Sequence, residues 1–234
     1  MGRVRASDVA QCIGLVGDIH TESVLLERSL AFLQGLGVDL LLSVGDVVDG
    51  PEEVEGANRC CELLRQYGVH TVCGNHDRWL LEDVMRDLPD AIGSFELEPE
   101  SLRLLEGLPP TLTFATPEGE LLLCHGLGTD DMAWLSPVSI MATEPQARAA
   151  LEQLLEGNRY RFVVSGHSHR RFVRRIGDTT FINVGTLHRG YHPTIGLLDL
   201  TTREIVFHGI SKEKGPWVEE RIPVPACPRV SAAG

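Results

Sequence analysis

The chain has 234 residues, of which 43% are hydrophobic and 23% are charged, and its formal net charge is -12. This length fits one sizeable globular domain and is too short for two comfortable ones. Because so acidic a surface repels polyanions and no basic tract offsets it, we expect no long nucleic acid as a partner.

The first half of the chain alternates short apolar runs with helical patterns, which is typical of βαβ units. We predict strands at 12–16, 40–44 and 69–73, and helices between them at 22–36 and 52–67. In the first helix the apolar residues lie on roughly one face, and Gly35 and Gly37 end it. Polar residues gather in the turns after all three strands.

The later segments are predicted as two short helices and then mostly strands. The helices lie at 79–88 and 99–108, and a hairpin joins 112–114 to 120–124. We interpret 129–145 as a candidate lid, and 146–155 as a helix. Strands are predicted at 162–164, 171–175, 179–184, 196–200 and 204–208. The proline-rich tail from 215 is expected to be extended or loosely held.

The absence of a repeat or linker predicts a single domain over 1–234, with a motif core at 13–210 and a tail at 215–234. No stretch approaches the roughly 18 apolar residues of a membrane span, so we expect no membrane contact. The six cysteines form no Cys-x-x-Cys pair, and no apolar run of signal-peptide length follows the N-terminus. We therefore expect reduced thiols and a cytoplasmic protein.

Metal-binding side chains recur in short clusters directly after five predicted strands. They are Asp18 and His20; Asp46 and Asp49; Asn75, His76 and Asp77; His125; and His167 and His169. Because ligands in an open α/β sheet gather beyond the carboxyl ends of its strands, these clusters can converge on one crevice. Oxygen and imidazole donors without thiolates suit Mn²⁺, Fe, Zn²⁺ or Ni²⁺ rather than Ca²⁺ or an iron–sulfur cluster.

The local pattern of the clusters supports this interpretation. A glycine before a cluster lets the backbone turn sharply and lets a metal or phosphate approach. Residues two apart in an extended segment point the same way, so Asp-x-His and His-x-His can hold one ion or flank two. Taken singly, each residue has a structural alternative: a helix cap, a turn residue or a core histidine. For Asp77 we favour capping of the next helix.

The order Asp-x-His, Gly-Asp-x-x-Asp, Gly-Asn-His-Asp, His-Gly, Gly-His-x-His resembles the calcineurin-like metallophosphoesterases, in particular their small bacterial-type phosphodiesterases. The resemblance runs from Gly17 to His169, about two thirds of the chain. It implies an α/β fold, a four-layer α/β/β/α sandwich with two mixed β-sheets. The later strands would then belong to the second sheet.

The resemblance also implies a role for each motif residue. One divalent metal ion would be held by Asp18, His20 and His169, the other by Asn75, His125 and His167, and Asp46 would bridge both. His76 matches the histidine that protonates the leaving-group oxygen, and Asp49 matches the carboxylate that orients it. The two metal ions are expected to be Mn²⁺, with Fe, Ni²⁺, Zn²⁺ and Mg²⁺ as alternatives.

Such a centre hydrolyses a phosphate ester by attack of a metal-bound hydroxide, with a histidine as general acid. Protein phosphatases and dinucleoside polyphosphate hydrolases of this family carry arginines where this chain has Gly50 and Cys73. Those arginines clamp a phosphate dianion, so their loss favours small phosphodiesters as substrates, although Arg78 could substitute. The alternatives are a nucleotide or dinucleoside-polyphosphate phosphohydrolase, a protein phosphatase, and a non-catalytic metal-binding scaffold.

A few further residues stand near the motifs without a fixed role. Cys73 and Cys124 are interpreted as small buried residues, and the arginines at 170, 171, 174 and 175 as a solvated face. Asn183 is a candidate for the pocket wall, and His188 stays open because no motif fixes its role. The expected partner is a small phosphoester substrate, and homo-oligomerisation stays open.

Overall fold

Residues 9–136 and 145–225 of the computed structural model are described, and they begin with the expected βαβαβ arrangement. Its elements are β1 (Cys12–Val16), α1 (Ser23–Gly35), β2 (Leu40–Ser43), α2 (Glu53–Gln66) and β3 (His70–Thr71). β1 pairs in parallel with β2, and β2 with β3. Leu25, Leu26, Leu30 and Leu33 of α1 are buried, as the helical spacing predicts, whereas Val24 of the same predicted face is 39% exposed.

Two helices and the first hairpin follow: α3 (Asn75–Glu82), α4 (Pro99–Glu106), β4 (Thr111–Thr116) and β5 (Gly119–Cys124). Next come α5 (Pro145–Leu155), β6 (Tyr160–Ser165), β7 (Phe172–Ile176) and β8 (Thr179–Asn183). The described part ends with β9 (Thr194–Asp199), β10 (Glu204–Gly209) and β11 (Trp217–Pro223). Short 3₁₀ turns lie at Ser94–Glu96 and Glu156–Asn158.

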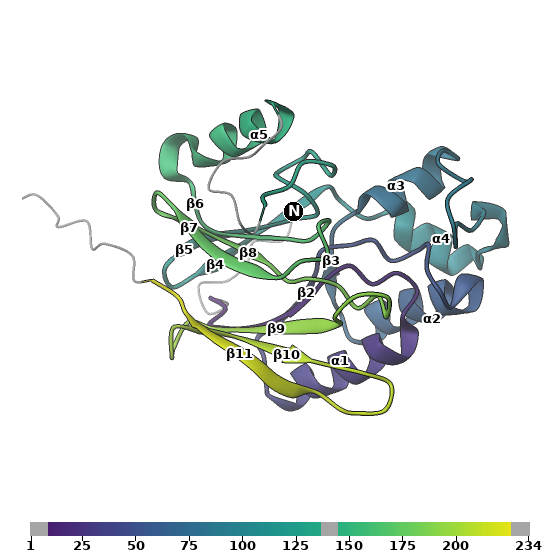
Figure 1. Ribbon diagram of the computed structural model, residues 1–234, viewed down its shortest axis with the longest axis horizontal. Coiled ribbons are helices and arrows are strands. Elements are labelled where there is room, and N and C mark those ends of the chain that lie inside the picture. The colour runs from purple at the N-terminus through teal and green to yellow at the C-terminus, as the bar shows by residue number, and fades with distance from the viewer. Residues whose placement is uncertain (1–8, 137–144, 226–234) are drawn as a thin grey trace, which may run out of the picture.

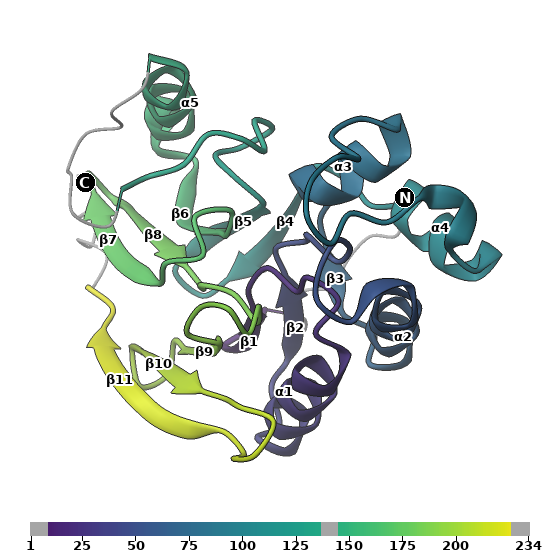
Figure 2. The ribbon, with the colours of Figure 1, turned by 45° about the vertical axis from the view of Figure 1, so that its right-hand side comes forward.

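The strands form two mixed sheets that pack face to face (Figure 1). The first sheet has the order β11-β10-β9-β1-β2-β3, and the second has the order β4-β5-β6-β8-β7. Helices α1 and α2 lie on the outer side of the first sheet, and α5 lies on the outer side of the second (Figure 2). This is the predicted four-layer α/β/β/α sandwich.

Two predictions about the elements were wrong, and the prediction for the tail held in one of its two forms. Only β7 and β8 of the later strands join the second sheet, while β9, β10 and β11 extend the first sheet in antiparallel fashion. The tail was expected to be extended or loosely held, and at Trp217–Pro223 it is extended, because this segment pairs with β10 as a strand. α3 begins at Asn75 rather than at 79 and ends before Asp83, whose φ of 53° is left-handed.

Some predictions fall where the structure gives no test. Residues 137–144, about half of the candidate lid, lie outside the described residues, as do residues 226–234 of the tail. The assignment of the chain to a single domain stays a prediction. Within residues 9–136 and 145–225, none of the helices combines the length and apolar character needed to cross a bilayer.

The apolar layer between the sheets is the core on which the site rests. Leu15 of β1, Phe162 of β6, Ile182 of β8 and Phe207 of β10 are fully buried there. Burial of such a side chain contributes about 1.5–3 kcal/mol relative to exposure. The strands that carry the polar clusters are thus fixed by contacts from both sheets.

Replacement of Phe162 by alanine is expected to lower the free energy of unfolding by about 3–5 kcal/mol, because it removes buried apolar surface and leaves a cavity. Phe95 is the matched control, since it is 91% exposed. Phe95→Ala should change the free energy of unfolding by no more than about 0.5 kcal/mol. Urea denaturation of both variants measures the difference, and equal effects would contradict the assignment of the core.

Candidate metal centre

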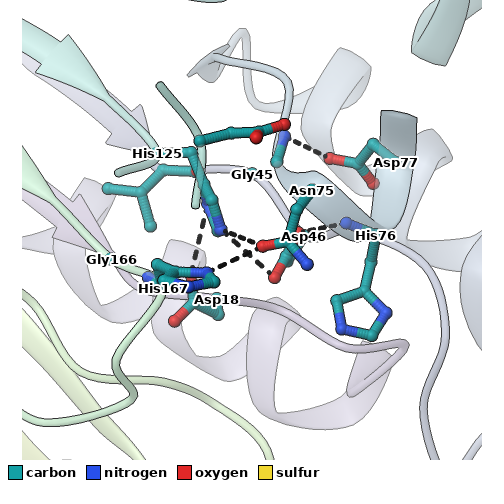
Figure 3. Close-up of polar contacts among 12 residues, drawn as sticks. Asp18, Gly45, Asp46, Asn75, His76, Asp77, His125, Gly166 and His167 are labelled. Carbon is teal, nitrogen blue, oxygen red and sulfur yellow. Dashed lines mark hydrogen bonds and ion pairs between the residues drawn. The ribbon is translucent and has the colours of Figure 1, made fainter. Parts of the chain in front are cut away.

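The turns after β1, β2, β3, β5 and β6 meet at one end of the two sheets and form a single polar cluster. Figure 3 shows His125, His167, Asn75 and Asp46 directed toward one another, with His76 beside Asp46. The structure brings together all seven residues for which metal binding was predicted: Asp18, His20, Asp46, Asn75, His125, His167 and His169. Five of them are less than 4% exposed, so the cluster lies largely out of water.

The backbone of this cluster is unusual in conformation. Positive φ is uncommon for residues other than glycine and tends to occur at functional sites, where the surrounding structure enforces it. The φ angles of five site residues lie between 47° and 63°: His20, Asp46, Asp49, His167 and His169. Hydrogen bonds between the turns support this geometry, since the backbone N–H groups of Ile19 and His20 both donate to the carbonyl of Asp46.

The donors fall into two groups that share one carboxylate. One group contains His20, Asp46 and His169, and the other contains Asp18, Asp46 and His125. Within each group the donor atoms lie within 4.8 Å of one another. Asp46 belongs to both groups, which is the arrangement expected of a bridging ligand.

Asn75 joins the second group, and Asp18, a member of that group, also contacts the first. Asn75 Oδ1 lies 2.9 Å from His125 Nε2 and 2.8 Å from His167 Nδ1. One oxygen of Asp18 lies 3.5 Å from His125 Nδ1, and the other lies 3.6 Å from His169 Nε2 of the first group. The predicted assignment of Asp18 to the His20 and His169 side is therefore one of two that the distances allow.

Backbone carbonyls fix two of the imidazole rings. His20 Nδ1 lies 2.8 Å from the carbonyl oxygen of Asp49, and His125 Nδ1 lies 2.7 Å from that of Val44. Because a carbonyl only accepts, each Nδ1 carries a proton and donates it. In the neutral ring the lone pair of Nε2 then faces the cluster, which is the usual tautomer of a metal-binding histidine.

The cluster holds more hydrogen-bond acceptors than donors. His20 Nε2 lies 3.0 Å from His169 Nε2, and the amide oxygen of Asn75 faces two imidazole nitrogens. Asp18 Oδ2 is buried and has no hydrogen-bond partner within the described part of the chain. Such contacts are unfavourable unless a proton or a cation lies among them. The residues present therefore fit divalent cations.

The pKa values of the cluster also indicate that its buried carboxylates require a nearby positive charge. Burial raises the pKa of Asp18 to about 7 and lowers the pKa values of His20 and His169 to about 4 and about 3. Burial also acts against ionised Asp46, but the neighbouring His125 holds the pKa of that carboxyl well below its usual range. For His125 itself, burial is outweighed by Asp46 and Asp18, which raise its pKa to about 10. The proton on His125 balances the negative charge of Asp46 and Asp18, and a bound cation would balance the same charge.

Gly74 and Gly166 are needed because a side chain there would collide with a carboxylate, and not because the backbone turns sharply. A Cβ atom on Gly74 would lie 2.1 Å from Asp46 Oδ1, and one on Gly166 would lie 2.4 Å from Asp18 Oδ1. Their φ angles are not positive, whereas Gly45 has a φ of 90°. The predicted sharp turn thus applies to Gly45, while Gly74 and Gly166 permit close approach.

Gly166→Ala is expected to displace the Asp18 carboxylate, and so to weaken metal binding by about 10–100-fold, the usual effect of disturbing the support of a metal ligand. Crowding should also lower the free energy of unfolding by about 1–3 kcal/mol. Gly35→Ala is the control, because a Cβ atom there meets nothing within 4 Å. It should leave metal affinity unchanged, as measured by calorimetric titration, and the proposed role of Gly166 would be contradicted if both variants behaved alike.

His76 lies beside the cluster and is held on two sides. Its backbone N–H donates to Asp46 Oδ1 (2.8 Å), and its Nδ1 lies 2.9 Å from Asp49 Oδ2. Burial lowers the pKa of His76, but the hydrogen bond with Asp49 and the charge of Asp46 outweigh burial, so the pKa is raised. The His76 side chain is 22% exposed and that of Asp49 is 1% exposed. A buried carboxylate therefore holds an imidazole that can reach a bound molecule.

Other residues noted in the sequence have structural roles. Asp77 caps the start of α3 through the N–H of Gly74 (3.0 Å), and the capping prediction is confirmed. Burial raises the pKa of the Cys73 and Cys124 thiols to about 12, which argues against thiolate chemistry. Asn183 donates to the carbonyl of Gly166 and so supports the turn that carries His167.

Arg78 does not stand free to clamp a phosphate. Its guanidinium donates to Asp131 at 2.6 and 3.1 Å and to Glu82 at 3.0 Å. Asp131 belongs to the loop beside a pocket of about 310 Å³, whose lining includes His167, Met132 and Trp134. This pocket is large enough for part of a small organic substrate next to the cluster.

Sequence reasoning missed the residues that fasten the site from outside. Arg86 binds Asp49 through two hydrogen bonds, and no motif marks it. Arg189 binds the fully buried Glu22 and thereby fixes the loop of His188, whose ring centroid lies 5.5 Å from that of His20. Both arginines lie outside the motifs, so only the folded chain shows their contacts.

Comparison with known proteins places these features in a family context. Residues 12–203 match the family model of the calcineurin-like phosphoesterase superfamily domain. Over 110 residues the chain is 28% identical to an uncharacterized protein of Methanocaldococcus jannaschii. That match covers 43% of this chain and 43% of the relative, so it spans less than half of either protein.

Solved structures share the fold over most of the chain. A metallophosphoesterase from Sphaerobacter thermophilus has a TM-score of 0.62 and 20% identity, with coverage of 86% of this chain and 88% of the other. A phosphodiesterase of archaeal origin has a TM-score of 0.54 and 16% identity, with coverage of 85% and 99%. At these identities the likeness shows a common architecture.

Proposed function

Because the chain belongs to the calcineurin-like phosphoesterase superfamily, we propose that it hydrolyses small phosphodiesters with two bound divalent cations and with His76 as general acid. The observation that carries this proposal is the 2.9 Å contact between His76 and Asp49 beside the two donor groups. A partly exposed histidine held by a buried carboxylate is suited to proton transfer. A scaffold or a metal-storage site has no such use for it.

The chain offers a complete set of ligands for the two cations. Those proposed are Asp18, His20 and His169 for one, Asn75, His125 and His167 for the other, and Asp46 for both. When bound, such cations lower the pKa of a coordinated water and neutralise phosphoryl oxygens. We expect Mn²⁺ as the active metal, and Fe, Ni²⁺, Zn²⁺ and Mg²⁺ are the alternatives to test.

His76 is positioned to protonate the leaving-group oxygen. Asp49 binds Nδ1, which leaves Nε2 as the atom that donates the proton. The ionised carboxylate of Asp49 stabilises the protonated ring, and the bond from the His76 backbone to Asp46 keeps the acid next to the shared ligand. General acid catalysis of this kind contributes about 10²–10⁴-fold in rate.

The preference for diesters rests on the arginines around the cluster. A phosphomonoester dianion carries one more charge than a diester and gains most from a free guanidinium fork. Three arginines near the site instead have carboxylate partners: Arg78 with Asp131, Arg86 with Asp49, and Arg189 with Glu22. The shared fold with an archaeal phosphodiesterase gives further support.

The test compares matched aryl substrates with protein stripped by a chelator and reloaded with Mn²⁺, Ni²⁺, Zn²⁺ or Mg²⁺. Methyl p-nitrophenyl phosphate represents a diester and p-nitrophenyl phosphate a monoester. Nucleoside phosphates and dinucleoside polyphosphates represent the alternative substrates. We expect turnover of the diester to return with Mn²⁺ and to exceed that of the monoester.

Each other outcome selects a different function. Turnover of the monoester alone would overturn the substrate preference and keep a phosphoesterase. Turnover confined to nucleotides or dinucleoside polyphosphates would identify a phosphohydrolase of those compounds. Failure of folded, metal-loaded protein to act on any of these substrates would favour the scaffold.

A further inference from the structure

The carboxylate of Asp49 is saturated with hydrogen bonds. Oδ2 accepts from His76 Nδ1 (2.9 Å) and from an Nη of Arg86 (2.8 Å). Oδ1 accepts from the other Nη of Arg86 (3.0 Å) and from the backbone N–H of Ile92 (3.1 Å). With its side chain 1% exposed, Asp49 depends on these four donors rather than on water.

The guanidinium of Arg86 is fixed as firmly as the carboxylate it binds. Its Nε donates to the carbonyl of Val84 (2.8 Å), and one Nη also donates to the carbonyl of Ile92 (2.8 Å). The Arg86 side chain is 18% exposed. It belongs to the segment directly after α3, the helix whose first turn carries Asn75 and His76. The segment that follows α3 therefore folds back so that Arg86 binds Asp49, the hydrogen-bond partner of His76.

A bidentate pair fixes the rotation of a carboxylate, because turning the carboxylate breaks both bonds. Without Arg86, Asp49 would keep His76 and the Ile92 N–H but would lose two of its four donors in a buried place. Such a group either rotates toward other donors or admits water. Lysine would restore the charge but cannot restore the fork.

We propose that Arg86 is a positioning residue for the reaction, which holds the Asp49 carboxylate in the orientation that directs His76 toward the leaving group. This inference rests on the proposed function of the site. The competing explanation is that Arg86 only fastens the loop of Val84 and Ile92, with no effect on His76. The two explanations differ in how the loss depends on the leaving group.

The experiment uses the full chain, loaded with Mn²⁺, and the variants Arg86→Gln and Arg86→Lys. Arg103→Gln is the control, since Arg103 is exposed and pairs with Glu100 on the surface of α4. Each protein hydrolyses two methyl phosphodiesters, one with p-nitrophenolate and one with an unactivated phenolate as leaving group. In parallel, proton NMR of the metal-free proteins records the Nδ1–H signal of His76, assigned by its loss in His76→Ala.

We expect Arg86→Gln to lower kcat about tenfold or more with the poor leaving group and less than about threefold with p-nitrophenolate, because only the first needs a proton. KM should stay within about twofold, and Arg86→Lys should recover only part of kcat. The Nδ1–H signal should shift or disappear in Arg86→Gln and persist in Arg103→Gln. Thermal unfolding establishes that each variant is folded.

The opposite results overturn the inference without touching the proposed function. Equal losses on both substrates with an unchanged His76 signal would assign Arg86 to loop structure alone. Full recovery of kcat by Arg86→Lys would show that charge suffices and that the fork does not matter. If even the wild-type protein hydrolyses neither diester, the proposed function fails. The His76 signal then decides whether Arg86 positions the pair, and an unchanged signal in Arg86→Gln rejects the positioning role.

Discussion

Asp46→Asn is expected to reduce diester hydrolysis by on the order of 10³-fold or more, beyond the 10–100-fold typical of residues that only support a metal ligand. Asparagine keeps the shape of the side chain but loses its charge. Asp46 is the one carboxylate common to both donor groups, with Oδ2 3.7 Å from His20 Nε2 and 3.3 Å from His125 Nε2. Both cations should therefore bind more weakly, and elemental analysis after gel filtration should find less metal per chain.

The control for this prediction is Asp178→Asn, which removes an exposed carboxylate paired with Arg175 in a surface turn. It should retain metal content and activity, since surface pairs contribute little. Thermal unfolding should show that Asp46→Asn is folded, because its effect concerns ligation. A variant at Asp46 that keeps two metals and most of its activity would contradict the shared-ligand role.

The elements recovered best from the sequence are those with strong local patterns. β1 and α1 were predicted within about one residue at their ends, because an apolar run or a one-sided helical face is visible locally. β11 was missed because it is an edge strand, and most of its side chains between Trp217 and Pro223 are exposed. Its pairing with β10 is a long-range contact that proline and charge patterns conceal.

The convergence of the predicted ligands could be anticipated because they lie in strand-end turns, and parallel strands bring such turns together. The start of α3 was predicted four residues too late, because its first turn consists of the polar residues of the motif. Asn75, His76 and Asp77 form the first helical turn, with Asp77 bonded to the N–H of Gly74, so the site residues are themselves the helix start. A search for apolar periodicity passes over a turn made of polar residues.

The supporting arginines could not be predicted, since their meaning depends on the path of a loop. Arg86 stands 37 residues from Asp49, and Arg189 stands 167 residues from Glu22. No apolar periodicity or residue spacing links such positions. The ion pairs also remove these arginines from direct phosphate binding, which the sequence alone left open for Arg78.

His76→Ala is expected to lower kcat by about 10²–10⁴-fold for a diester with a poor leaving group, because the departing oxygen then leaves without a proton. With p-nitrophenolate the loss should be far smaller, since that anion needs little protonation. The donor groups do not include His76, so metal content should match that of the wild type. This separates the variant from Asp46→Asn, which should lose metal and lose activity on both substrates.

His70→Ala is the control, because His70 is an exposed histidine of β3 and should not alter either rate. Steady-state rates on the two diesters, with metal content measured in the same samples, decide the matter. Equal losses on both leaving groups would mean that His76 acts by shaping the site and not as an acid. A loss that grows as the leaving group becomes poorer, with the metals retained, places the proton transfer on His76. Since Asp49 orients His76, its variants should then show the same dependence on the leaving group.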